Sequence, residues 1–129
     1  MEMIADASAF LSVVLDEVDR EWVIEKTSGS ALSSPEVLPY EIANALSAMK
    51  KRGRLTDREA LKAFGISQRI PVRLLSIRIQ DALKIAMKFN TYAYDAFYVQ
   101  CCLETKLPLL SLDNRMYEVA QSLSIKVVT

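Results

Sequence analysis

Residues 3–11 read MIADASAFL, and this stretch decides the fold class. Three apolar residues, Met3 to Ala5, are followed by Asp6-Ala7-Ser8, and a helical spacing of apolar residues then begins at Phe10 and continues to Leu15. The pattern predicts a short buried strand, a turn and a helix. Strand-helix units of this kind build a parallel sheet covered by helices.

The same alternation continues along the rest of the chain. Helices are predicted over about 20–26, 35–52, 56–64, 77–88, 92–105 and 114–123, and strands over 70–75, 108–112 and 125–128. The segment TSGSALSSPEV, residues 27–37, is predicted to hold at most two or three strand residues. Because the strands are short and almost wholly apolar, we expect an α/β fold, a three-layer α/β/α sandwich with a short, mostly parallel central sheet.

Two helix boundaries are marked by recognisable capping residues. Gly53 follows the cations 50–52, as a C-cap glycine does, and ends the helix predicted over 35–52. Thr56 with Glu59 three residues later forms a capping box, which begins the next helix.

Length and composition are those of an ordinary globular protein. The chain has 129 residues, of which 51% are hydrophobic and 25% charged, so residues 1–129 are expected to form a single domain. A net charge of zero neither supports nor excludes a nucleic-acid partner. No stretch reaches the roughly 20 apolar residues of a membrane span and MEMIADAS does not resemble a signal peptide, which predicts a cytoplasmic protein without a membrane partner. Adjacent Cys101 and Cys102 are expected to be buried free thiols.

The absence of histidine limits the possible chemistry. With no histidine in the sequence, His-containing catalytic triads and HExxH zinc sites are excluded. Any reaction must use carboxylates, hydroxyls, amines or a hard metal ion.

Four acidic residues are candidates for such a site. Asp6 and Asp113 each follow a predicted strand, at the sheet edge where ligands of parallel sheets gather, although capping explains either one alone. Asp95, in TYAYDAFYVQ at 91–100, shares a helix face with apolar residues, so its carboxylate is expected to point toward the packed side. A first-turn interaction with the helix N-terminus is the alternative for Asp95. Glu41 lies beside the apolar face of its helix, where a solvated side chain is the alternative.

Carboxylates that share one crevice need a proton or a cation. Two unit charges about 5 Å apart at an effective dielectric near 20 repel by roughly 3 kcal/mol. If the four acids converge, the sequence therefore predicts a metal, and ligands that are all oxygen favour Mg²⁺ or Mn²⁺.

Four segments, in this order, resemble a known family. They are MIADASAFL, LPYEIANALSAMKKRGRLT, YDAFYVQCCLETKLPLLSLDNRM and VAQSLSIKVV. Together they resemble a PIN domain, specifically the VapC-type toxins of toxin-antitoxin modules, over nearly the whole chain. Ala5, where bulkier residues are frequent, is a mild departure.

The resemblance implies a function and its site. It implies a metal-dependent endoribonuclease that hydrolyses RNA phosphodiester bonds, as the toxin of a type II toxin-antitoxin module. Mg²⁺ or Mn²⁺ would be held by Asp6, Asp95 and Asp113, with Glu41 binding directly or through water. Ser8 and Asn44 match the family positions that orient ligands or water, although a structural role for each stays open. RNA, a small antitoxin protein and a second copy of the chain are the implied partners.

Several alternatives remain open. A catalytically silent PIN-like module that binds RNA or protein would keep the fold without cleavage. A phosphoacceptor receiver domain is disfavoured because it needs an acidic pair after the first strand. Lys51, Arg52 and Arg115 are weak candidates for RNA contacts, and a helix C-terminus already explains the first two. The aromatic residues Tyr92, Tyr94, Phe97 and Tyr98 are interpreted as core or dimer-interface residues rather than base-stacking ones.

Overall fold

The structure, a computed structural model, describes residues 1–129 and contains seven helices and four strands. In chain order these are β1 (Glu2–Ala5), α1 (Ala7–Val14), α2 (Arg20–Thr27), β2 (Ala31–Pro35), α3 (Leu38–Lys51), α4 (Asp57–Ser67), β3 (Arg73–Leu75), α5 (Ile79–Phe89), α6 (Ala93–Thr105), β4 (Leu109–Leu110) and α7 (Asn114–Ser122).

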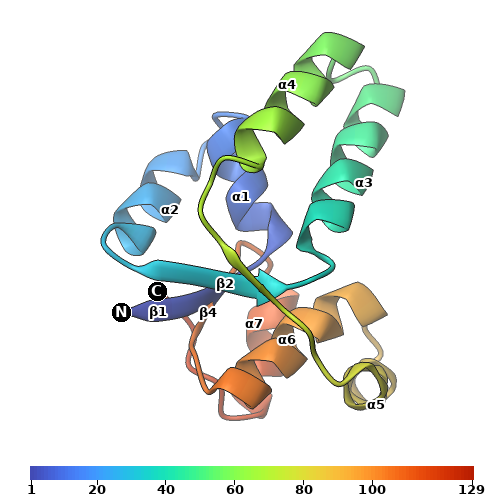
Figure 1. Ribbon diagram of the computed structural model, residues 1–129. Coiled ribbons are helices and arrows are strands. Elements are labelled where there is room, and N and C mark those ends of the chain that lie inside the picture. The colour runs from blue at the N-terminus through green and yellow to red at the C-terminus, as the bar shows by residue number, and fades with distance from the viewer.

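The four strands form one parallel sheet between two layers of helices. The strand order is β3-β2-β1-β4, and every pairing is parallel. Helices α1 to α4 lie on one side of the sheet and α5 to α7 on the other (Figure 1). The predicted three-layer α/β/α sandwich is confirmed.

The strand order reverses between β1 and β4. From β1 the chain passes to β2 and β3 on one side, and later returns to place β4 on the other side of β1. Ligands of open α/β sheets bind where the strand order reverses in this way, here beyond the ends of β1 and β4. Helix α3 starts after β2, and α6 runs back toward the start of β4, so both helices begin at this same edge.

A single hydrophobic core of 26 buried residues holds the layers together. Strand β1, which lies between β2 and β4, supplies Met3, Ile4 and Ala5, each at most 1% exposed. Cys101 and Cys102 are buried free thiols of α6, as predicted. None of the helices is long and apolar enough to cross a membrane.

Strand β2 corrects the prediction for residues 27–37. It has five residues rather than two or three, although its sequence ALSSP is rich in serine. Ser33 and Ser34 are buried, and the Ser34 hydroxyl donates a hydrogen bond to the Ala5 carbonyl of β1. A strand buried between β1 and β3 tolerates serine because its hydroxyl is satisfied by the neighbouring backbone.

Several boundaries also differ from the prediction. Strand β3 starts at Arg73 rather than Ile70, since Pro71 has no N–H to donate. The strand expected over 108–112 is reduced to β4, and the one expected over 125–128 to an isolated bridge between Leu109 and Val127. Helix α3 starts at Leu38, and α4 continues through Gly65 to Ser67.

Both predicted capping features are present. Thr56 and Glu59 make the reciprocal bonds of a capping box at the start of α4. Gly53, with φ of +74°, follows the C-cap Arg52 of α3. A positive φ is adopted by glycine without steric cost, which is why it follows the helix end.

Candidate metal centre

Asp6 directly follows β1, at the carboxyl edge of the sheet, and both of its carboxylate oxygens accept hydrogen bonds. It is 4% exposed. Oδ1 accepts hydrogen bonds from Ser8 Oγ at 2.7 Å and from the Ala9 amide at 3.2 Å, and Oδ2 accepts one from Ser111 Oγ at 2.7 Å. The bond from Ala9 is the N-cap of α1, so the capping interpretation of Asp6 is correct and does not exclude a further role.

Burial dominates the acid-base behaviour of Asp6. Desolvation raises its pKa to about 6, against the lowering effect of its three hydrogen bonds, and the charge of Asp113 adds to the rise. A nearby cation would therefore stabilise the charged form of Asp6.

Two serine hydroxyls cross-link the ends of β1 and β4. Ser8 Oγ accepts from the Leu112 amide at 3.1 Å, and Ser111 Oγ accepts from the Asp113 amide at 3.0 Å. Each hydroxyl thus fixes Asp6 to the segment after β4. Sequence reasoning identified Ser8 but missed Ser111; the available signal was a hydroxyl residue directly after the strand that pairs with β1.

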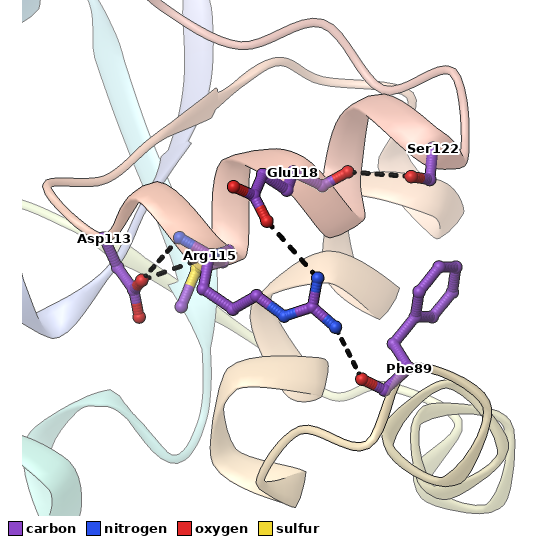
Figure 2. A network of polar contacts seen from close by, with 6 residues as sticks. Phe89, Asp113, Arg115, Glu118 and Ser122 are labelled. Carbon is purple, nitrogen blue, oxygen red and sulfur yellow. Dashed lines mark hydrogen bonds and ion pairs between the residues drawn. The ribbon is translucent and has the colours of Figure 1, made fainter.

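Asp113 occupies the start of α7. Its Oδ1 accepts from the amides of Arg115 at 2.9 Å and Met116 at 3.3 Å, which makes it the N-cap of the helix (Figure 2). Its second oxygen, Oδ2, makes no hydrogen bond. Capping thus uses one oxygen and leaves the other available.

Glu41 lies in the first turn of α3 and is partly buried. Its Oε2 is shielded from solvent and has no hydrogen-bond partner. Burial, together with the charges of Asp6 and Asp95, raises the pKa of Glu41 to about 7, against a lowering effect of the Tyr98 side chain. The solvated-surface alternative for Glu41 is therefore incorrect.

Asp95 lies in the first turn of α6, whose N-cap, Tyr92, makes no side-chain capping bond. The Asp95 side chain makes no hydrogen bond either. Its pKa is raised, mainly by burial and to a smaller extent by the charge of Asp113. A carboxylate stabilised by a helix N-terminus has a lowered pKa. Because the pKa of Asp95 is raised, burial and the charge of Asp113 outweigh any stabilisation of its carboxylate by the helix N-terminus.

The four acids form one electrostatic group, which we call the carboxylate cluster: Asp6, Glu41, Asp95 and Asp113. The pKa of one member is raised by another in each of the pairs Asp6 with Asp113, Glu41 with Asp6, Glu41 with Asp95, and Asp95 with Asp113. These pairwise influences link all four acids through their charges.

The cluster is not preassembled around an ion. No three acidic side chains converge closely enough to hold a metal in this structure. Mutual repulsion opposes such convergence until a cation is bound. Even so, the donors suit Mg²⁺ or Mn²⁺, because they are all oxygen and Glu41 Oε2 is a buried acceptor without a partner.

Comparison with known families identifies the architecture. The sequence profile of the PIN domain family matches residues 3–122. The chain belongs to the PIN domain family. This PIN domain is also 28% identical over 124 residues to Ribonuclease VapC3 of Pyrobaculum aerophilum, which covers 92% of the chain and 94% of the relative.

Two solved structures share the fold of this PIN domain. The crystal structure of PAE2754 from Pyrobaculum aerophilum has a TM-score of 0.71 and 19% identity, and covers 95% of this chain and 92% of that one. The VapBC2 complex of Rickettsia felis, bound to a DNA fragment from its promoter, has a TM-score of 0.67 and 6% identity, with coverage of 99% and 98%. At these identities the similarity concerns the fold alone.

Arg115 is the basic candidate that the PIN domain places beside the cluster. Its Nη2 donates to the Phe89 carbonyl at 2.6 Å and its Nη1 to Glu118 Oε2 at 3.3 Å (Figure 2). Phe89 ends α5, and its carbonyl lacks a helical partner, so Arg115 ties α7 to the end of α5. Arg115 and Asp95 line the same small pocket.

The other sequence candidates, Lys51, Arg52 and Asn44, belong to α3 and its C-cap. Lys51 and Arg52 are ten and eleven residues after Glu41 along α3 and its C-cap, which is about 15 Å at 1.5 Å per residue, so they are away from the cluster. Asn44 is exposed and its side chain makes no hydrogen bond, which also excludes the side-chain to backbone bond considered for it.

Proposed function

We propose that this PIN domain is a metal-dependent endoribonuclease that hydrolyses RNA phosphodiester bonds with Mg²⁺ or Mn²⁺ held by the carboxylate cluster. The observation that carries the proposal is that the pKa values of Asp6, Glu41 and Asp95 are raised by burial and by the charge of a neighbouring cluster member, at the point where the strand order reverses. Carboxylates kept in such surroundings carry a cost that a cation offsets. The resemblance to Ribonuclease VapC3 supports RNA as the substrate.

The chain's own residues would prepare the site. When bound, the ion lowers the pKa of a water molecule and stabilises charge on the scissile phosphate. Ser8 and Ser111 hold Asp6 by both oxygens, so its orientation is fixed before the ion arrives. Asp113 is oriented by the amides of α7 and offers its free Oδ2. Glu41 offers the unpartnered Oε2, and Asp95 approaches from α6 on the other layer.

Cleavage assays test this proposal directly. Purified chain incubated with structured RNA is expected to produce fragments when Mg²⁺ or Mn²⁺ is present, and to lose this activity in excess EDTA. For aspartate-to-asparagine substitutions in the carboxylate cluster, Asp16→Asn is the matched control, because Asp16 is exposed and its positive φ suits asparagine. No cleavage at any concentration of either metal would favour the silent binding module.

Arg115 is proposed to contact an RNA phosphate next to the cluster. Arg115→Ala is expected to raise the KM for RNA about fivefold, the equivalent of about 1 kcal/mol for an exposed charge contact, with kcat nearly unchanged. Arg115→Lys retains the charge and is expected to recover part of the loss. Lys51→Ala, far along α3, serves as the control, and an equal effect there would contradict a local contact.

The biological role proposed for the chain is that of a cytoplasmic type II toxin. A small antitoxin would neutralise it, and the chain would form a homodimer, as the resemblance to VapC-type toxins and the VapBC2 neighbour suggest. A short upstream gene for a DNA-binding antitoxin would support this role, and growth arrest on expression, relieved by that gene, tests it. A solitary nuclease would have no upstream antitoxin gene and would cause no growth arrest that such a gene relieves.

A further inference from the structure

Only two shielded side-chain polar atoms in the chain have no hydrogen-bond partner: Glu41 Oε2 and the hydroxyl oxygen of Tyr98, Oη. Leaving a buried polar group unsatisfied costs about 1–3 kcal/mol. Such atoms are rare in folded proteins, and each needs an explanation. That one of the two belongs to the carboxylate cluster suggests that the other is connected with it.

Tyr98 lies on the inner side of α6, three residues after Asp95. Its side chain is fully buried, with 0% exposed. Burial is the largest influence on the pKa of Tyr98 and raises it; the charges of Glu41 and Asp6 and a side-chain interaction with Glu41 raise it further, while the Ala7 amide lowers it. The phenol therefore lies beside Glu41 and Asp6 and is closed off from solvent.

Core packing explains the ring of Tyr98 but not its hydroxyl. A phenylalanine would fill nearly the same volume and leave no polar atom unsatisfied. Tyr117 provides a contrast, because its hydroxyl accepts from the Ser111 amide at 3.2 Å and donates to the Val128 carbonyl at 2.6 Å. In Tyr98 the same group is present without a structural bond.

We propose that Tyr98 is a positioning residue whose hydroxyl donates a hydrogen bond to Glu41 Oε2 when a bound cation draws the carboxylate cluster together. Neither atom makes a hydrogen bond of good geometry, yet the Tyr98 hydroxyl is near enough to the Glu41 side chain to lower the pKa of Glu41, so a small movement of Glu41 satisfies both atoms. A carboxylate ligand held in this way keeps its second oxygen directed at the ion. The inference rests on the proposed function, since it needs the cluster to bind metal.

Tyr98→Phe tests the inference with readouts that a purely structural hydroxyl would not change. Mn²⁺ affinity, measured by electron paramagnetic resonance without RNA, is expected to fall about 10–100-fold, the usual effect of losing a partner of a metal ligand. We expect kcat to fall with it at fixed metal concentration, and the KM for RNA to stay within about twofold. The melting temperature of the metal-free protein is expected to stay equal or rise, because no hydrogen bond is lost.

A matched control and a double mutant sharpen the test. Tyr94→Phe removes an exposed hydroxyl from the same helix and is expected to match the wild type in all three measurements. In a Glu41→Ala background, Tyr98→Phe is expected to have no further effect on Mn²⁺ affinity, because there is no carboxylate left to position.

The outcomes separate the inference from the function on which it rests. A wild-type chain that binds Mn²⁺ and cleaves RNA, with Tyr98→Phe unchanged in both, would overturn the positioning role alone. The positioning role would also be overturned if Tyr98→Phe lowered the Mn²⁺ affinity by the full amount in the Glu41→Ala background. A wild-type chain that neither binds Mn²⁺ nor cleaves RNA would overturn the proposed function and the inference with it.

Discussion

Asp6→Asn is expected to lower the rate of RNA cleavage by at least about 100-fold. Substitution of a residue that only hydrogen-bonds to a metal ligand already lowers metal affinity or activity about 10–100-fold. Asparagine keeps the shape of aspartate, and its amide oxygen can still accept from Ser8 Oγ and cap α1 through the Ala9 amide. The amide nitrogen can donate to Ser111 Oγ. The variant therefore removes the charge while keeping the fold.

Three comparisons make the Asp6→Asn result specific. Single-turnover cleavage of labelled RNA is measured at saturating Mn²⁺ for the wild type, Asp6→Asn, Asp95→Asn and the control Asp16→Asn. Asp95→Asn is expected to share the loss, although Asp95 has no hydrogen bonds to keep. Cleavage that survives at wild-type rate in both cluster variants would exclude the metal nuclease.

The second large effect is on stability: the metal-free protein is expected to become less stable as pH rises from about 4 to about 7. In the folded state the pKa of Asp6 is raised from 3.8 to about 6 and that of Glu41 from 4.5 to about 7. Between the unfolded and folded pKa values the folded chain binds more protons than the unfolded chain, so the free energy of unfolding falls with rising pH. For fully buried Asp6 the shift amounts to about 3 kcal/mol. Partly exposed Glu41 and Asp95 act in the same direction.

Thermal melts of EDTA-treated protein at pH 5 and pH 8 measure this effect. The wild type is expected to melt at a lower temperature at pH 8, and saturating Mn²⁺ to restore stability there much more than at pH 5, where protons compete for the carboxylates. Asp6→Asn is expected to flatten the pH dependence and to be more stable than the metal-free wild type at pH 8. A wild type that gains stability from pH 5 to pH 8 without metal would contradict the coupled cluster.

The two predictions together describe an exchange of stability for function. Removing a charge from the cluster is expected to stabilise the fold and remove the activity. Substitutions in an ordinary core or cap do the reverse, since they lower stability and affect activity only through folding.

Local signals were sufficient for much of the fold and for part of the site. Thr56 with Glu59 marked a helix start, and the apolar run before Asp6 marked β1, because these features depend on neighbours in sequence. The position of Asp6 at the carboxyl end of its strand followed from the same pattern.

Long-range contacts could not be predicted from the sequence. Ser111 binds Asp6 across 105 residues, and strand β2 exists because β1 and β3 flank a serine-rich segment that has little strand character of its own. The unpartnered hydroxyl of Tyr98 belongs to the same class, since the spacing of aromatic residues identified a core ring but gave no account of its polar atom. Tertiary packing decides these features, so they required the structure.

Asp6, Glu41, Asp95 and Asp113 are proposed to hold a divalent cation. A crystal structure of the chain grown with Mn²⁺ near pH 8, with anomalous diffraction data, tests this proposal most directly. We predict an anomalous peak beyond the carboxyl ends of β1 and β4, with cluster oxygens about 2.0–2.6 Å from it, the range for hard cations with oxygen ligands. A crevice without a peak at saturating Mn²⁺, or an ion bound only elsewhere on the chain, would contradict the account.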